Sequence, residues 1–163
     1  MHDQSVATYD RFLGALADLL TKAEAHCTAK KIPPEALLGF RIFPDMYPLT
    51  GQVQLACDFA ARAAARLVGD EPQSFADTET TFAELQTRIA AARAYIAGFG
   101  ADRLADAATR QITLKMRHGE MTMSGQAYLN MFSMPQFFFH MTTAYNILRH
   151  NGIEVGKRDF MGA

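Results

Sequence analysis

The chain has 163 residues, 49% of them hydrophobic, and a formal net charge of −1, which is the composition of an ordinary globular domain. This length predicts one domain over residues 1–163, because two domains would each be unusually small. The near balance of 16 basic and 17 acidic residues argues against nucleic-acid binding. No apolar run is long enough to cross a membrane, and the two cysteines follow no metal-binding spacing. We therefore expect a reduced, cytoplasmic protein with no membrane or nucleic-acid partner.

Apolar residues recur every three or four positions over four long segments, which predicts amphipathic helices near residues 5–30, 49–68, 81–99 and 124–150. Thr81 and Glu84 have the spacing of a capping box at the start of the third helix. Gly69 stands directly after the second helix, where glycine commonly forms a C-cap. Pro135 lies inside the fourth segment and predicts a kink or a break near Ser133.

Between residues 109 and 124 the period changes from helical to two. Apolar and polar residues alternate on both sides of His118-Gly119, which predicts a β-hairpin with its turn at these two residues. Residues 34–48 are expected to form a long crossing loop. Residues 153–163 show no period and are expected to lie over the helices.

Four helices, a long first crossing loop and a hairpin before the last helix together resemble the DinB/YfiT-like superfamily. Residues 140–153 (HMTTAYNILRHNGI) resemble the end of its last helix, where a metal-binding His stands eight residues before a Leu-Arg pair. Residues 43–50 (FPDMYPLT), 77–85 (DTETTFAEL) and 148–160 (LRHNGIEVGKRDF) resemble a bacterial subfamily of unknown function. The resemblance covers the whole chain. It implies an all-α four-helix bundle with a short β-hairpin before the last helix, and a homodimer that pairs through helix faces.

The resemblance also implies a metal site, built from one His early in the second helix and a His-x-x-x-His pair in the last. His140 stands at the second position of that pair, but Gln136 stands at the first. Early in the second helix the chain offers only Gln52 or Gln54. An amide oxygen is a poor ligand for zinc or nickel. We therefore expect a degenerate metal site and no cofactor, with Zn or Ni at His140 as the less favoured alternative.

Six side chains are candidates for a ligand pocket: His140, Gln136, Gln54, Asp58, Gln52 and Tyr145. Gln54 and Asp58 are four residues apart, as are Gln136 and His140, so four polar groups converge if their two helices face each other. Asp58 stands in an apolar stretch, where a carboxylate needs a partner. We expect His140 to point inward and to approach Gln54 or Asp58. A buried polar network that only fixes the register of the helices is the competing interpretation.

Three further histidines and both cysteines are interpreted as structural residues: His26, His118, His150, Cys27 and Cys57. The phenylalanines and methionines of the last helix are interpreted first as core, and second as the lining of an apolar cavity. Arg41, Asp45 and Tyr47 in the crossing loop would stand at the rim of such a cavity. A salt bridge that anchors the loop is their alternative role.

Three functions in different classes follow from these residues. The favoured one is a small-molecule-binding or structural module with a degenerate metal site and a small apolar or amphipathic ligand. The alternative is a metal-dependent or metal-free transferase or hydrolase that resembles DinB-type thiol transferases, centred on His140 with Asp58 as its partner. The third is an interaction protein whose helices form a homodimer or dock a partner. No Ser-His-Asp order and no phosphate-binding glycine motif is present.

Overall fold

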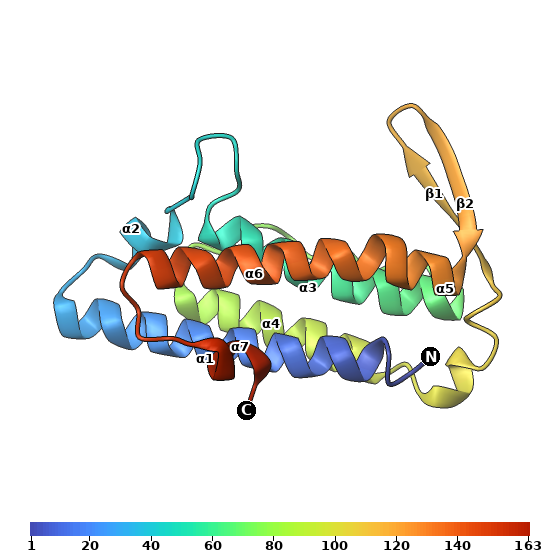
Figure 1. Ribbon diagram of the computed structural model, residues 1–163, viewed down its shortest axis with the longest axis horizontal. Helices are drawn as coiled ribbons and strands as arrows, with labels where there is room; N and C mark the ends of the chain where they lie inside the picture. Colours follow the sequence, from blue (N-terminus) through green and yellow to red (C-terminus); the bar gives the residue numbers. More distant parts are fainter.

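The computed structural model describes all 163 residues, and most of them are helical (Figure 1). The long helices are α1 (Val6–Lys30), α3 (Leu49–Val68), α4 (Phe82–Ala97) and α6 (Met134–His150). A hairpin of β1 (Gln111–Met116) and β2 (Gly119–Ser124) leads into the short helix α5 (Gly125–Ala127) and the π-helical segment η2 (Tyr128–Ser133). The other short helices are α2 (Pro34–Leu38), η1 (Ala101–Leu104) and α7 (Lys157–Met161).

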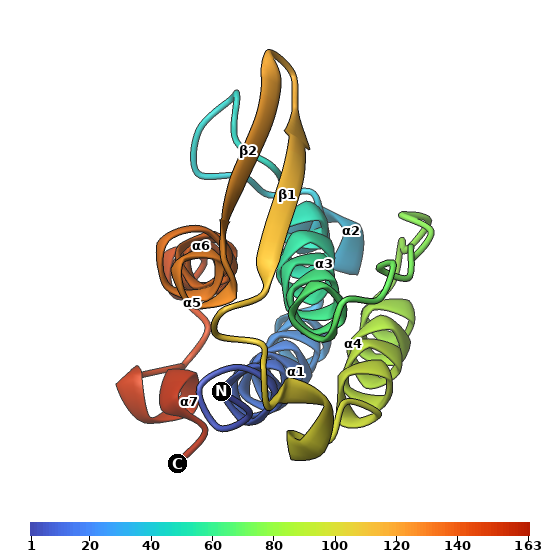
Figure 2. The ribbon, with the colours of Figure 1, turned by 90° about the vertical axis from the view of Figure 1, so that its right-hand side faces the viewer.

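The four long helices lie side by side, with α3 packed against both α6 and α4, and α1 packed against α4 (Figure 2). Their apolar faces form one continuous core, and the short helix α7 packs on the outside of α1. The apolar stripe expected for the third long helix is buried throughout, at Phe82, Leu85, Ile89, Ala92, Ile96 and Phe99. The helices are therefore held together by the apolar side chains that recur every three or four residues in the sequence.

The helices α1, α3 and α4 begin and end within two residues of the expected positions, and so does the continuous helical segment formed by α5, η2 and α6. The expected capping box is present: Thr81 Oγ1 accepts from the Glu84 N–H at 3.2 Å, and the Glu84 carboxylate accepts from the Thr81 N–H at 3.0 Å. Gly69 ends α3 with φ of 87°, a conformation that glycine adopts without strain. The start of α4 and the end of α3 are thus closed by the residues that sequence rules assign to them.

The break expected near Ser133 takes the form of a π-helical segment. The chain runs from η2 directly into α6, and Pro135 lies in the first turn of α6. Proline has no N–H to donate and its ring crowds the preceding turn, so a wider turn accommodates it without ending the helix. The hydroxyl of Ser133 is buried here and shares a 2.9 Å hydrogen bond with the hydroxyl of Tyr9 in α1. This bond ties the break to the core.

The hairpin turn lies one residue earlier than expected. Met116 pairs with Gly119 across the strands, so Arg117 and His118 form the two-residue turn. Gly119 is the first residue of β2 and has φ of 140°, which explains its position after the turn. Alternation alone does not fix which two residues turn.

Two segments expected to be irregular contain short helices. Residues 34–38 form α2, which starts at Pro34, and proline is already set for the first turn of a helix. Residues 157–161 form α7, whose start is capped by a 2.7 Å hydrogen bond from the Gly156 N–H to the Asp159 carboxylate. Both helices are too short for a hydrophobic period to reveal them.

The hairpin and the loop between α2 and α3 stand out from the helices on the same side of the molecule, at opposite ends of α6 (Figures 1 and 2). Ile112 and Leu114 fix the hairpin at its base, because both are buried. None of the helices has the length and apolar content needed to cross a membrane.

Candidate functional site

The interface between α3 and α6 places His140 against Gln52. Nδ1 of His140 lies 2.8 Å from Oε1 of Gln52, and Nε2 of Gln52 donates to the carbonyl oxygen of Tyr47 at 2.9 Å. A carbonyl oxygen only accepts, so the amide nitrogen of Gln52 must face Tyr47 and its oxygen must face the imidazole. His140 therefore donates from Nδ1, and its Nε2 carries the lone pair.

The imidazole of His140 is neutral because it is buried. The residue is 7% exposed, its ring stacks on Phe59 at 5.5 Å, and Phe139 meets it edge-on at 5.2 Å. This desolvation lowers the pKa of His140 from 6.5 to about 4. Nε2 has no hydrogen-bond partner in the protein, and it is not fully buried. The site thus presents a fixed, uncharged hydrogen-bond acceptor.

Gln54 and Asp58 face the other side of α3, toward α4. The carboxylate of Asp58 is 2.6 Å from Arg88 and 2.6 Å from Arg62. Gln54 donates to Glu79 at 2.8 Å, and Glu79 lies 3.0 Å from Arg88. Arg88 is only 3% exposed, so these residues form a buried ionic network between α3, α4 and the segment before α4.

The expectation that His140 approaches Gln54 or Asp58 is therefore wrong. Residues 52 and 54 point about 200° apart around a helix, so only one of them can face α6. Asp58 pairs instead with Arg88, since a guanidinium stabilises a buried carboxylate better than a neutral imidazole does. Arg88 is the residue that sequence reasoning missed. Its only signal is its place beside Ile89, on the edge of the buried stripe of α4.

The other two pocket candidates do not join the pair formed by His140 and Gln52. Gln136 is half-buried one turn before His140 and makes no side-chain hydrogen bond. Tyr145 points about 140° away from His140 around α6. Its ring packs edge-on against Phe160 at 5.7 Å, next to α7. Tyr145 therefore belongs to the packing of α7 and not to this site.

Three of the other four histidines, those interpreted as structural residues, lie apart from His140. His26 is half-buried near the end of α1, and His118 is exposed in the hairpin turn. His150 is exposed in the last turn of α6, where its ring lies 5.5 Å from the ring of Phe40. None of them contributes a second imidazole to the α3–α6 interface.

The cysteines and the crossing loop supply no reactive group. Cys27 and Cys57 are free and buried, and burial raises the pKa of the Cys57 thiol to about 12, which disfavours the thiolate. Arg41 donates to the carbonyl oxygen of Pro44 at 3.4 Å and does not pair with Asp45. Of the two roles considered for this loop, the salt bridge is replaced by a hydrogen bond to the backbone, and none of the three loop residues lines the apolar cavity beside Cys27.

The positions where the resemblance implies metal ligands hold one imidazole and amides. His140 is the single imidazole, its Nδ1 is engaged by Gln52, and the other positions hold amides. No three His, Cys, Asp or Glu side chains are grouped so that they could hold a metal ion. A lone neutral imidazole with amide neighbours is a weak donor set for these metals.

An apolar cavity of about 220 Å³ lies between α1, α2 and the segment after α6. Cys27, Leu37, Phe40 and Ile153 are among its lining residues. Its volume is below the range of about 300–1,000 Å³ that is usual for drug-sized ligands. The cavity therefore has room only for a small apolar molecule.

The long helices, the hairpin before the last one and the inward-facing His140 together define a DinB-like helical protein. A crystal structure of a DinB family member protein from Shewanella denitrificans is similar to this chain, with 41% sequence identity and a TM-score of 0.94. The similarity covers 99% of this chain and 92% of that one. Within this class the chain belongs to the family described as "Domain of unknown function (DUF1993)", whose model matches residues 1–161. No curated protein matches the chain.

Proposed function

We propose that this protein is a DinB/YfiT-type four-helix bundle that binds a small amphipathic molecule at the α3–α6 interface, in place of a metal. The observation that supports this most directly is the hydrogen-bond chain from the Tyr47 carbonyl through Gln52 to His140. It holds Nδ1 as the donor and leaves Nε2 as an acceptor. A hydroxyl or N–H group of a ligand is the matching partner.

The surroundings of His140 favour a neutral, partly apolar ligand. The imidazole carries no charge near pH 7, because its pKa is about 4, so it does not attract anions. Phe139 stands edge-on beside it with 56% of its surface exposed. A ligand that donates to Nε2 would place its apolar part against this ring and remove it from water.

The alternative, a transferase or hydrolase centred on His140, has less support. A general base works best when its pKa lies near the working pH, and the pKa of His140 is about 4. Asp58 is occupied by Arg88 and Arg62 and cannot orient the imidazole. Binding is thus favoured over catalysis at this site, with the metal position degenerate.

The test uses pairs of probes that differ only in their donor. Phenol and anisole form one pair, and indole and N-methylindole form the other. We expect phenol and indole to shift the ring resonances of His140 and of Phe59, which stacks on it, in NMR titrations, and the methylated probes to do so far less. In His140→Phe, the Phe59 resonances should respond equally to both members of each pair. Equal responses to both members of each pair would overturn the proposal.

A metal measurement separates ligand binding from the metal-dependent form of the enzyme alternative. Protein purified under mild chelation should hold no stoichiometric zinc or nickel. If it does, and if His140→Ala removes the metal, the enzyme alternative takes precedence over ligand binding.

A further inference from the structure

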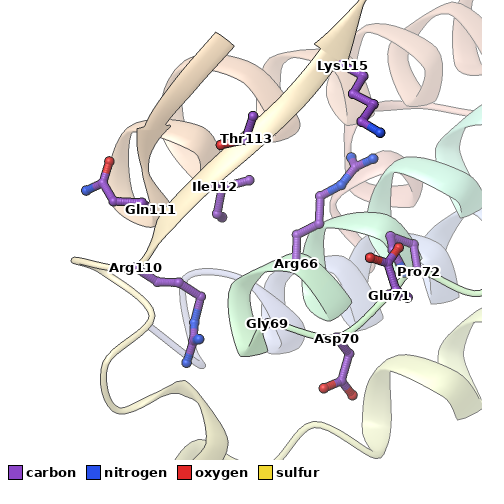
Figure 3. A pocket seen from close by; sticks show the side chains of 10 residues that line it. All are labelled: Arg66, Gly69, Asp70, Glu71, Pro72, Arg110, Gln111, Ile112, Thr113 and Lys115. Carbon is purple, nitrogen blue, oxygen red and sulfur yellow. The ribbon is translucent and has the colours of Figure 1, made fainter. Parts of the chain in front are cut away.

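A separate, polar cavity of about 590 Å³ lies between the end of α3, the segment that follows it and strand β1 (Figure 3). Three basic side chains line it: Arg66, Arg110 and Lys115. Its volume is within the range that holds metabolite-sized ligands. The polarity of its wall distinguishes it from the apolar cavity beside Cys27 and points to a charged ligand.

Arg66 has unused donors at this cavity. Its Nη1 donates to the hydroxyl of Tyr128 at 3.2 Å, which leaves the Nε and Nη2 edge without a protein partner. Neither of these nitrogens is among the atoms sealed from solvent. No carboxylate lies within ion-pair distance of the guanidinium. Such an edge offers two parallel N–H donors, which match two oxygens of a phosphate or carboxylate group.

Lys115 projects from β1 toward the guanidinium of Arg66, so that two like charges face each other across the cavity (Figure 3). Like charges at close range destabilise each other unless an anion lies between them. Lys115 is exposed, so it is free to close on a ligand. The pair has the arrangement of a clamp for an oxyanion.

Arg110 forms the lower wall and helps to shape the cavity. Its Nε donates to the Leu67 carbonyl at the end of α3, at 3.1 Å. Its guanidinium also lies so close over Gly69 that a Cβ there would be 2.7 Å from Nη1. Glycine at this position therefore serves both the positive φ and the close approach of the arginine. Arg110 is thus a positioned cation that also closes the helix end.

Two carboxylates also line the cavity, but they do not neutralise these cations. Asp70 accepts two hydrogen bonds from Arg103, at 2.9 and 3.0 Å. Glu71 is exposed and forms no ion pair. Glu120 stands opposite Lys115 in the hairpin and adds a third carboxylate. Against the three basic residues of the wall and Arg103, these three carboxylates still leave a net positive charge around the cavity.

We propose that this cavity binds a small molecule through an anionic oxygen group, a phosphate or a carboxylate. Arg66 contributes the bidentate donor edge, Lys115 the second cation opposite it, and Arg110 the positive lower wall. The site is independent of His140 and takes the opposite class of ligand, charged instead of neutral.

The first test titrates ¹⁵N-labelled protein at low ionic strength with inorganic phosphate and, separately, with acetate. We expect saturable shifts confined to residues 66–72 and 110–115, with a Kd that rises with added sodium chloride. Tighter binding of phosphate assigns a phosphate-bearing ligand, and tighter binding of acetate assigns a carboxylate. Shifts that do not saturate, or that spread over the surface, would overturn the proposal.

The second test uses matched charge variants. Lys115→Gln should weaken binding by about tenfold, the loss expected for a charged hydrogen bond. Arg117→Gln removes an exposed cation from the same hairpin but outside the cavity, and should change the Kd by less than about twofold. Arg66→Lys keeps the charge but removes the two-donor edge, so it too should weaken binding. Equal losses in Lys115→Gln and Arg117→Gln would mean diffuse attraction and would refute the site. His140→Phe should leave phosphate binding intact.

Discussion

The imidazole of His140 links folding to pH. Its pKa is about 4 in the folded chain, against 6.5 when exposed, so below about pH 6.5 the unfolded chain binds a proton that the folded chain does not. The stability contributed by neutral His140 is therefore complete above pH 6.5 and is lost as the pH falls through 4. We expect this loss to reach about 3 kcal/mol between neutral pH and pH 4.

Urea unfolding at a series of pH values measures this linkage. His140→Gln is the control, because it keeps a polar group beside Gln52 while removing the titration. Carboxylates such as Glu79 titrate in both proteins, so the difference between the two stability curves isolates the imidazole. Parallel curves would show that His140 is solvated in the folded state.

The buried ion pair of Arg88 with Asp58 joins two opposite charges, whereas the pair of His140 with Gln52 is neutral. Arg88→Met leaves Asp58 and Glu79 without their main cation, so we expect a loss of about 3–5 kcal/mol in unfolding free energy. Arg88→Met combined with Asp58→Leu should cost less than the sum of the two single variants. Denaturant midpoints measure all three. Additive losses would mean that the pair contributes no coupling.

A second cycle tests the separation of the two networks. Asp58 and His140 share no hydrogen-bond partner. The effects of Asp58→Ala and His140→Ala should therefore add to within about 0.5 kcal/mol. Strong coupling between these substitutions would contradict the arrangement described here.

Part of the candidate site could be predicted from single residues, and part could not. The inward position of His140 and its polar partner from α3 could be predicted from the resemblance of residues 140–153 to the family's last helix and from the helical period. The choice between Gln52 and Gln54 could not be predicted, because it depends on which face of α3 meets α6. The burial of Arg88 could not be predicted for a related reason: a long basic side chain at the edge of an apolar stripe usually reaches water. Only the packed helices show that it turns inward to three carboxylates.

At the scale of elements, the junction between the hairpin and α5 is closed by a glycine. The Gly125 N–H donates to the Arg110 carbonyl at 2.8 Å, and a Cβ on Gly125 would lie 1.9 Å from the carbonyl oxygen of Ala107. The Ala107 carbonyl belongs to the backbone, so it cannot move away from a new Cβ as easily as a flexible side chain can. We expect Gly125→Ala to destabilise the protein by about 1–3 kcal/mol or more through this clash.

Gly14 in α1 is the matched control for that substitution. A Cβ there would meet only the guanidinium of Arg93 at 3.5 Å, which is ordinary contact distance. Alanine favours a helix interior over glycine by up to about 1 kcal/mol, so Gly14→Ala should stabilise the chain. Thermal unfolding compares the two variants. A neutral Gly125→Ala would show that the base of the hairpin is free to shift.

The long helices and the hairpin could be predicted because each repeats one period over many residues. Register and short helices could not. The turn at Arg117 and His118 is set by the pairing of Met116 with Gly119, which alternation leaves open by one residue. Helices α2 and α7 have five residues each, fewer than two turns, so no stripe forms. The start of α2 is set by a proline in its first turn, and the start of α7 by a carboxylate that caps it.

At the scale of the whole molecule, most of the exposed large apolar side chains belong to a few elements. Seven of the nine large ones lie in the loop before α3, in the hairpin, and along η2 and α6: Ile42, Phe43, Tyr47, Met116, Met121, Met131 and Phe139. The loop and the hairpin stand out on the same side, at opposite ends of α6 (Figure 1). Apolar surface collected in this way is typical of an interaction site.

We expect this side to form the interface of a homodimer. In a twofold dimer the same surface of both copies meets, so the apolar surface of one copy would cover that of the other. Met131 is 79% exposed and lies apart from His140, so Met131→Asp tests the interface without touching the ligand site. In sedimentation velocity at micromolar concentrations, the wild type should sediment as a dimer and Met131→Asp as a monomer. Ala90→Asp, on the exposed face of α4, adds the same charge elsewhere and should leave the dimer intact. A wild-type monomer at high micromolar concentration, or dissociation by both substitutions alike, would refute this interface.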